Sequence, residues 1–190
     1  MNDVSLYLGG TRSGKSVRAE EHVLRVADGP ILYVATAVAH AEDVAMTERI
    51  RRHQARRPAH WRTLECPRHL GEKIAEALSA LPDAPGRPTV LLDCVTLWVS
   101  NILFSLSDPE DLVAFEAEIR AEAESLLSLM RSSRCRWVLV SGETGLGGIA
   151  ASRIGRVYDD GLGLVNQLLS AEAQEAFLVV AGRLLRLEKP

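Results

Sequence analysis

The residues best suited to chemistry lie near the start of the chain, in the segment "GGTRSGKS" (9–16). Gly9, Gly14, Lys15 and Ser16 satisfy the pattern G-x-x-x-x-G-K-[ST]. The glycines let the backbone wrap closely around phosphates, so that successive N–H groups and the start of a helix face the anion. In such a loop the lysine reaches the β- and γ-phosphates, and the hydroxyl ligates Mg²⁺. The segment therefore predicts a site for a nucleoside triphosphate and Mg²⁺.

The segment follows a short apolar run and opens a helical pattern, a context that separates a phosphate-binding loop from an accidental glycine-rich turn. We expect Lys15 to act catalytically and Ser16 to be a metal ligand. The residues expected around the phosphates are Gly9, Gly10, Thr11, Arg12, Ser13, Gly14, Lys15 and Ser16.

A carboxylate ends the apolar run "TVLLD" (89–93). Folds with a phosphate-binding loop place an acidic residue at a neighbouring strand end, where it holds Mg²⁺ directly or through water. Asp93 fits that position and is the second expected metal residue. The alternative is that Asp93 is a turn residue that caps the helix after it.

Positive charge and imidazole are concentrated in "RIRRHQARRPAHWRT" (49–63), which holds six arginines, two histidines and a tryptophan. The chain as a whole has a formal net charge of −3, so the concentration is local. Such a stretch binds nucleic acid, binds a smaller polyphosphate or forms a solvated helix face. The near-neutral composition and the lack of interleaved stacking aromatics argue against a nucleic-acid partner.

Short β-rich runs alternate with segments of helical period along the 190 residues. This order predicts an α/β domain with a mostly parallel sheet, in the three-layer arrangement of P-loop NTPases, and we expect one domain over 1–190. A loop is expected at 82–88. The helix over 110–131 is expected to be capped by Ser107 or Asp108 and to start near Pro109. The predicted strands are 4–8, 31–36, 89–93, 136–141 and 176–182, and the predicted helices are 15–27, 42–56, 69–81, 110–131 and 155–172.

The most apolar window, 89–106, contains Asp93, Ser100 and Asn101, and is too interrupted for a membrane span. It is interpreted instead as a buried strand that runs into a helix. No secretory signal is expected at the N-terminus. The three cysteines show no C-x-x-C spacing, which suits a reducing compartment. We therefore expect a cytoplasmic protein.

Several of these segments together are typical of one family. "GGTRSGKS", "LYVAT", "RIRRHQARRPAHWRTLE", "LLDCVTLWVSNILF", "ETGLGGI" and "GLVNQLLS" occur in its order and approximate spacing. The chain resembles the bifunctional adenosylcobinamide kinases / adenosylcobinamide-phosphate guanylyltransferases of the cobalamin pathway. The resemblance implies two reactions. ATP or GTP phosphorylates adenosylcobinamide, and GTP then donates GMP, through a histidine, to adenosylcobinamide phosphate. It also implies a homo-oligomer, a trimer.

Matched by position, the histidine that carries GMP is His53, while His60 stays an alternative. Some relatives have two adjacent histidines here, and this chain has Arg52 in the first position. A neutral imidazole is a competent nucleophile near pH 7, and nearby arginines hold back its protonation and neutralise phosphate charge. The remaining nucleotide-contacting residues, from the resemblance or from this charge argument, are Ala35, Thr36, Ala37, Arg52, Gln54, Arg56, Arg57, Glu65 and Asp93.

Other family positions have simpler interpretations. Trp61 and Trp98 are expected in the core, and Asn101 and Asn166 match family positions but equally suit local backbone caps. The segment 142–163 departs from the family pattern, which leaves the corrinoid-binding residues unassigned. The competing function is a monofunctional P-loop small-molecule kinase, in which His53 merely contacts phosphate and GTP never labels the protein.

Overall fold

A seven-stranded sheet organises the computed structural model, which describes residues 3–38, 47–48, 51, 54–55 and 57–189. The strand order is β3-β2-β4-β5-β1-β6-β7, and every pair is parallel except β6 with β7. The strands are β1 (Asp3–Gly9), β2 (Ile31–Ala35), β3 (Arg62–Glu65), β4 (Thr89–Asp93), β5 (Arg136–Gly142), β6 (Glu175–Val180) and β7 (Arg183–Leu187).

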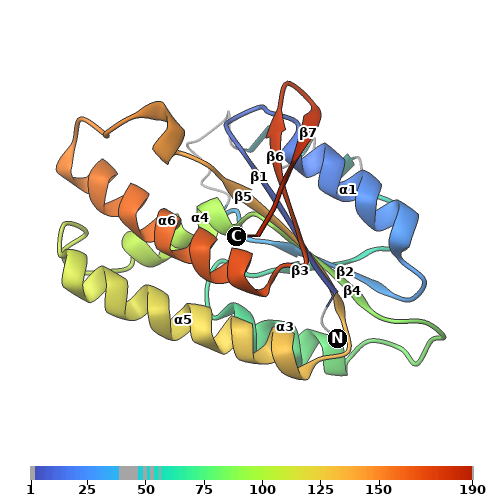
Figure 1. Ribbon diagram of the computed structural model, residues 1–190. Coiled ribbons are helices and arrows are strands. Elements are labelled where there is room, and N and C mark those ends of the chain that lie inside the picture. Colours follow the sequence, from blue (N-terminus) through green and yellow to red (C-terminus); the bar gives the residue numbers. More distant parts are fainter. Residues whose placement is uncertain (1–2, 39–46, 49–50, 52–53, 56, 190) are drawn as a thin grey trace.

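Helices cover both faces of the sheet. Helix α1 lies on one face, and α3, α4, α5 and α6 lie on the other (Figure 1). The three-layer, mostly parallel α/β fold predicted from the sequence is therefore confirmed. The helices are α1 (Lys15–Val26), α3 (Leu70–Ser79), α4 (Val95–Leu103), α5 (Leu112–Ser132) and α6 (Arg153–Glu172), and a 3₁₀ turn, η1 (Gly145–Gly147), follows β5.

Each face of the sheet has its own apolar cluster. The larger one joins the strands to the four-helix layer and contains the fully buried Trp98 and Phe115. The smaller one lies under α1 and contains Tyr7, Tyr33 and Trp61. Burial on both faces explains why the central strands read as near-continuous apolar runs. Both tryptophans lie in the core, as predicted.

The two strands that the sequence did not predict are the two edges of the sheet. Strand β3 is mostly exposed and reads "RTLE", while every residue of β7 is exposed. Neither segment needs an apolar pattern because neither is buried on both faces. Strand β7 returns antiparallel to β6 through Ala181 and Gly182, which have φ values of 49° and 74°.

The start of α5 differs from the prediction. The capping residue is Asp111, whose side chain accepts a hydrogen bond from the backbone N–H of Ala114 at 3.0 Å. Asp108 instead accepts from the N–H of Glu110, so "SDPED" forms a turn and the helix begins at Leu112. Prediction from the sequence placed the cap three or four residues too early, because the segment offers several side chains that can cap a helix.

Two further expectations from the sequence concern membrane spans and the predicted helix 42–56. No helix among the described residues combines the length and the apolarity needed to cross a membrane. Much of the predicted helix 42–56 lies outside the described residues, and the described ones within it (47, 48, 51, 54 and 55) are helical.

Candidate active site

The loop between β1 and α1 contains the residues predicted to bind phosphate. It turns sharply because Gly14 has φ 97° and Arg12 has φ 59°. The backbone N–H of Ser13 donates to Gly10 O at 3.2 Å, and Lys15 Nζ donates to Gly10 O at 3.1 Å. The lysine ammonium therefore folds back over the loop from the first residue of α1, where a helix N-terminus favours anions.

Close contacts with the β6–β7 turn support the phosphate-binding loop. A Cβ at Gly9 would lie 2.6 Å from both Ser13 Oγ and Val179 O, so only glycine fits there. The β6–β7 turn packs against the loop, with the N–H of Gly182 donating to Ser13 O at 2.7 Å. Arg18 of α1 donates through Nε to Gly182 O, also at 2.7 Å. The unpredicted hairpin thus supports the loop that the sequence identified.

Asp93 lies beside the phosphate-binding loop although its strand is not next to β1. Strand β5 separates β4 from β1 in the sheet. Ser16 Oγ nevertheless donates to Asp93 Oδ1 at 3.2 Å, because α1 crosses the sheet face toward β4. The structure therefore brings Ser16 and Asp93 together, and their role as metal ligands stays a prediction. The strand adjacency assumed for Asp93 is wrong.

The ends of β2 and β4 are tied together through Thr36. Its hydroxyl donates to Cys94 O at 2.7 Å and accepts from Cys94 N–H at 2.9 Å. The side chain of Asn101 on α4 donates to Thr36 O and to Pro67 O, which follow β2 and β3. Asn101 therefore clamps two strand ends that are distant in sequence and is not a local cap. Nucleotide contact by Ala35, Thr36 and Ala37 stays a prediction.

Asn166 makes a similar clamp on the other side of β4. Its amide donates to Gly142 O at 2.9 Å, and its carbonyl accepts from the buried hydroxyl of Ser141 at 2.6 Å. The Gly142 N–H donates in turn to Thr96 Oγ1. The segment that departs from the family pattern is thus fixed at its start to α4 and α6.

Cys94 follows Asp93 but does not offer a nucleophile. Burial, reinforced by the neighbouring Asp93 carboxylate, raises the pKa of the Cys94 thiol to about 11. The thiol therefore stays protonated near neutral pH, whereas the thiolate is the reactive form.

The described end of the arginine-rich stretch lines a pocket of about 290 Å³ at the outer edge of the sheet. Arg57 lies with its Cζ 3.6 Å from the centroid of the Tyr33 ring. The buried Nε atom of Arg57 and the buried Nε1 atom of Trp61 have no hydrogen-bond partner among the described residues. The pocket is lined by Gln54, Arg57, Pro58, Ala59, Trp61, Thr63 and Glu65.

This pocket brings together three of the residues predicted around the nucleotide: Gln54, Arg57 and Glu65. His53, Arg52 and Arg56 lie outside the described residues. His60 is exposed in the turn closed by Trp61 N–H and Pro58 O, and it is not among the lining residues.

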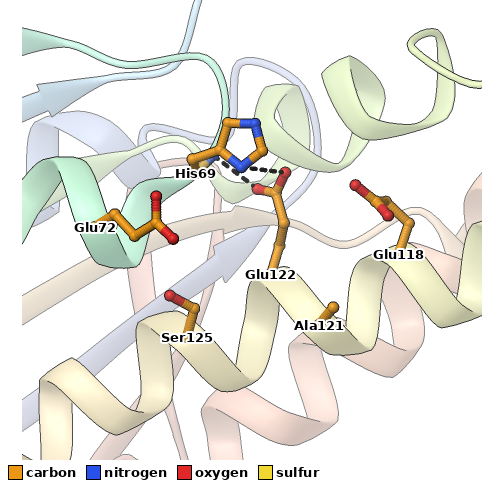
Figure 2. A pocket seen from close by; sticks show the side chains of 6 residues that line it. All are labelled: His69, Glu72, Glu118, Ala121, Glu122 and Ser125. Atoms are coloured by element: carbon orange, nitrogen blue, oxygen red, sulfur yellow. Dashed lines mark hydrogen bonds and ion pairs between the residues drawn. The ribbon is translucent and has the colours of Figure 1, made fainter.

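A second pocket, of about 200 Å³, lies between the start of α3 and α5 (Figure 2). The buried Glu122 carboxylate accepts hydrogen bonds there from Arg68 Nε, Trp98 Nε1 and the backbone N–H of His69, at 2.7, 2.7 and 2.9 Å. A buried carboxylate with this many donors is a structural anchor for the β3–α3 connection. Its contacts explain why a charged residue is tolerated among apolar neighbours.

Comparison with known proteins identifies the family. A family model described as "Cobinamide kinase / cobinamide phosphate guanyltransferase" matches residues 5–187. The chain belongs to this family. It is therefore a bifunctional enzyme of cobalamin biosynthesis, a cobinamide kinase and cobinamide phosphate guanylyltransferase, as the resemblance implied.

Relatives of this kinase and guanyltransferase family match over nearly their whole length. The "Bifunctional adenosylcobalamin biosynthesis protein CobU" of Salmonella typhimurium is 42% identical over 183 residues, covering 93% of this chain and 95% of that protein. The "Bifunctional adenosylcobalamin biosynthesis protein CobP" of Pseudomonas aeruginosa is 38% identical over 177 residues, covering 93% and 92%.

Solved structures extend the likeness to the fold alone. One ATPase domain has a TM-score of 0.54 at 10% identity, covering 93% of this chain and 69% of that one. An ATPase from the type III secretion system of pathogenic bacteria has a TM-score of 0.55 at 10% identity, covering 93% and 50%. The chain therefore shares the α/β fold of these ATPases.

Proposed function

We propose that the chain transfers the γ-phosphate of ATP or GTP to adenosylcobinamide, and then transfers GMP from GTP to adenosylcobinamide phosphate through His53. One observation carries the proposal. The phosphate-binding loop and the end of the arginine-rich stretch are connected through a single series of side chains, from Ser16 through Asp93 and Tyr33 to Arg57. Both reactions act on a nucleoside triphosphate, and a shared site explains how one chain performs both.

In the kinase step the protein mainly binds, orients and neutralises charge. The loop N–H groups and the start of α1 hold the β- and γ-phosphates, and Lys15 neutralises charge on them. The hydroxyl of adenosylcobinamide attacks the γ-phosphorus, and the bond from that phosphorus to the β–γ bridging oxygen breaks. ADP or GDP leaves, and the hydroxyl proton is released. Because this chemistry depends on position and charge, it needs no nucleophile from the protein.

The oxygens of Ser16 and Asp93 suit Mg²⁺ at the phosphates. A hydroxyl and a carboxylate are hard oxygen donors, and the two atoms lie 3.2 Å apart. No group of three or more His, Cys, Asp or Glu side chains in the described chain is arranged to hold a metal. Mg²⁺ bound with phosphates needs only one or two protein ligands, so the pair is sufficient. When bound, Mg²⁺ neutralises charge developing on the phosphate oxygens.

Asp93→Asn is expected to raise the Mg²⁺ concentration for half-maximal activity by about tenfold or more, and to slow both reactions, because the amide loses the charge that holds the metal. The measurement is each rate as a function of Mg²⁺ concentration. Asp160→Asn, an exposed position on α6, is the matched control and should leave the profile unchanged. An unchanged Mg²⁺ dependence in Asp93→Asn would reduce Asp93 to a structural residue.

In the guanylyl step His53 is the nucleophile. A nitrogen of the neutral imidazole attacks the α-phosphorus of GTP, a P–N bond forms, and the bond to the bridging oxygen breaks as pyrophosphate leaves. The proton on the other ring nitrogen passes to solvent. An oxygen of adenosylcobinamide phosphate then attacks the same phosphorus. The electron pair of the breaking P–N bond returns to the ring, which takes up a proton from solvent and becomes the neutral imidazole again. The product is adenosylcobinamide-GDP.

The pocket at the edge of the sheet is proposed to take the guanosine part of GTP. Trp61 and Arg57 supply a flat wall and buried donors, and Glu65 supplies a carboxylate at the rim. A carboxylate accepts two hydrogen bonds from the N1–H and 2-amino groups of guanine, whereas the corresponding ring nitrogen of adenine is itself an acceptor. Glu65 is therefore proposed to favour guanine in the second reaction.

Glu65→Gln is expected to raise the KM for GTP in guanylyl transfer by about tenfold, because an amide cannot accept from both donors of guanine. Steady-state kinetics with GTP as the varied substrate measure the change. Glu72→Gln alters a glutamate in the pocket on the opposite face of the sheet and should have no effect. An unaltered KM in Glu65→Gln would remove Glu65 from the nucleotide site.

Product analysis tests the function as a whole. Incubation with adenosylcobinamide, GTP and Mg²⁺, followed by mass spectrometry, should give first the phosphate and then the GDP derivative. A reaction that stops at adenosylcobinamide phosphate would favour the monofunctional kinase instead. Three finer proposals are kept with this function. Length and composition favour one domain over residues 1–190, the cysteine usage favours a cytoplasmic enzyme, and the family resemblance favours a homo-trimer.

A further inference from the structure

Tyr33 occupies a central place between the two parts of the site. It lies on β2, between Thr63 of β3 and Leu91 of β4 in the register, and is 1% exposed. Its side chain belongs to the apolar cluster on the α1 face, the face that also carries Ser16 and Asp93. A buried tyrosine on a strand can serve for core packing alone, but both the hydroxyl and the ring of Tyr33 make specific contacts.

The hydroxyl of Tyr33 fixes the orientation of Asp93. It donates to Asp93 Oδ2 at 2.7 Å, while Ser16 Oγ donates to Oδ1 at 3.2 Å. A phenol hydroxyl is protonated near neutral pH, so it can donate to a carboxylate. The carboxylate plane is thus held by one donor from the phosphate-binding helix and one from the sheet.

The ring of Tyr33 fixes Arg57. The guanidinium carbon lies 3.6 Å from the ring centroid, within the range of a cation–π contact. The Trp61 ring stacks against the Tyr33 ring, with centroids 6.3 Å apart and an interplanar angle of 30°. Arg57 Nε has no hydrogen-bond partner among the described residues, so at that atom no hydrogen bond competes with the aromatic face in orienting the guanidinium at the wall of the pocket.

We infer that Tyr33 is a positioning residue that couples the two halves of the site, orienting Asp93 through its hydroxyl and Arg57 through its ring. The inference rests on the proposed function, since it assigns Asp93 to the metal and Arg57 to GTP. If Tyr33 has this role, its two contacts can be removed separately by mutation. Removing the hydroxyl alone should weaken Mg²⁺ binding. Removing the ring should also weaken nucleotide binding in the absence of Mg²⁺.

The test measures binding of a fluorescent, ribose-labelled GTP to the full chain, in EDTA and across a Mg²⁺ titration. Tyr33→Phe should raise the half-saturating Mg²⁺ concentration by about threefold to tenfold and leave the Kd in EDTA within about twofold of wild type. Tyr33→Leu should show the same Mg²⁺ shift and also weaken binding in EDTA by about fivefold. Thermal unfolding, followed by circular dichroism, shows whether each variant is as fully folded as the wild type at the assay temperature.

Tyr7→Phe is the matched control. Tyr7 is also 1% exposed, lies on the central strand β1 and belongs to the same apolar cluster, but its ring contacts are with His22 and Phe177. Tyr7→Phe removes a hydroxyl from a second buried ring and should show no Mg²⁺ shift. A double-mutant cycle adds a second check: Arg57→Ala should weaken binding in EDTA when combined with Tyr33→Phe, but cause little further loss when combined with Tyr33→Leu.

Two outcomes would overturn the inference, and they are distinguishable. If Asp93→Asn and Arg57→Ala each alter binding while Tyr33→Phe matches Tyr7→Phe, Tyr33 is only a core residue and the proposed site stands. If neither Asp93→Asn nor Arg57→Ala alters binding, the assignment of the site itself is wrong, and the role of Tyr33 is wrong with it.

Discussion

Lys15→Ala is expected to lose both phosphorylation of adenosylcobinamide and guanylyl transfer, each by about a hundredfold to a thousandfold. Both reactions develop charge on phosphate oxygens that the loop holds, and Lys15 is the cation at the start of α1. Alanine keeps the helical propensity at this position, so the fold should persist. The measurement is the rate of each reaction by product analysis, together with thermal unfolding.

Lys73→Ala serves as the control for Lys15→Ala. Lys73 is also a helical lysine, but it lies on α3 and pairs with Glu76 at 3.2 Å. Its removal should leave both rates unchanged. Normal turnover of GTP by Lys15→Ala would mean that the nucleotide binds elsewhere.

His53→Ala is expected to separate the two activities. Guanylyl transfer should fall by about 10⁴-fold or more, because the nucleophile is lost and the remaining contacts only position substrate. Phosphorylation of adenosylcobinamide should stay within about threefold of wild type, because that step uses position and charge. The two rates are measured separately, with adenosylcobinamide or its phosphate as the acceptor.

His60→Ala is the comparison that decides between the two histidines. It should retain guanylyl transfer, since His60 lies in an exposed turn and is not among the residues lining the edge pocket. Loss of guanylyl transfer in His60→Ala, with retention in His53→Ala, would reverse the assignment.

The parts of the site that were predictable from the sequence are those with a strict local pattern. The loop at 9–16 requires glycines for steric reasons, as the contacts a Cβ would make at Gly9 illustrate. Asp93 was predictable as a carboxylate at the end of an apolar strand. Its position near Ser16 was predictable because folds with a phosphate-binding loop place an acidic residue near that loop. The contact forms even though β5 lies between β4 and β1.

The parts that were not predictable depend on tertiary contacts between ordinary residues. Tyr33 sits in an apolar run where any large side chain would satisfy the pattern, and its contact with Asp93 spans 60 positions. Asn101 reaches the carbonyls of Thr36 and Pro67, which only the strand order brings together. The edge strands β3 and β7 lack the two-sided burial that gives parallel strands a recognisable pattern.

Covalent labelling with GTP tests the central claim most directly. Wild-type protein incubated with Mg²⁺ and α-labelled GTP should retain label after denaturation, and γ-labelled GTP should leave none. A P–N bond to histidine predicts label that is lost in acid and persists in base, the reverse of an acyl phosphate. His53→Ala should not label, and His60→Ala should. Absence of protein-bound label in the wild type, under conditions where adenosylcobinamide-GDP is formed, would contradict the histidine intermediate.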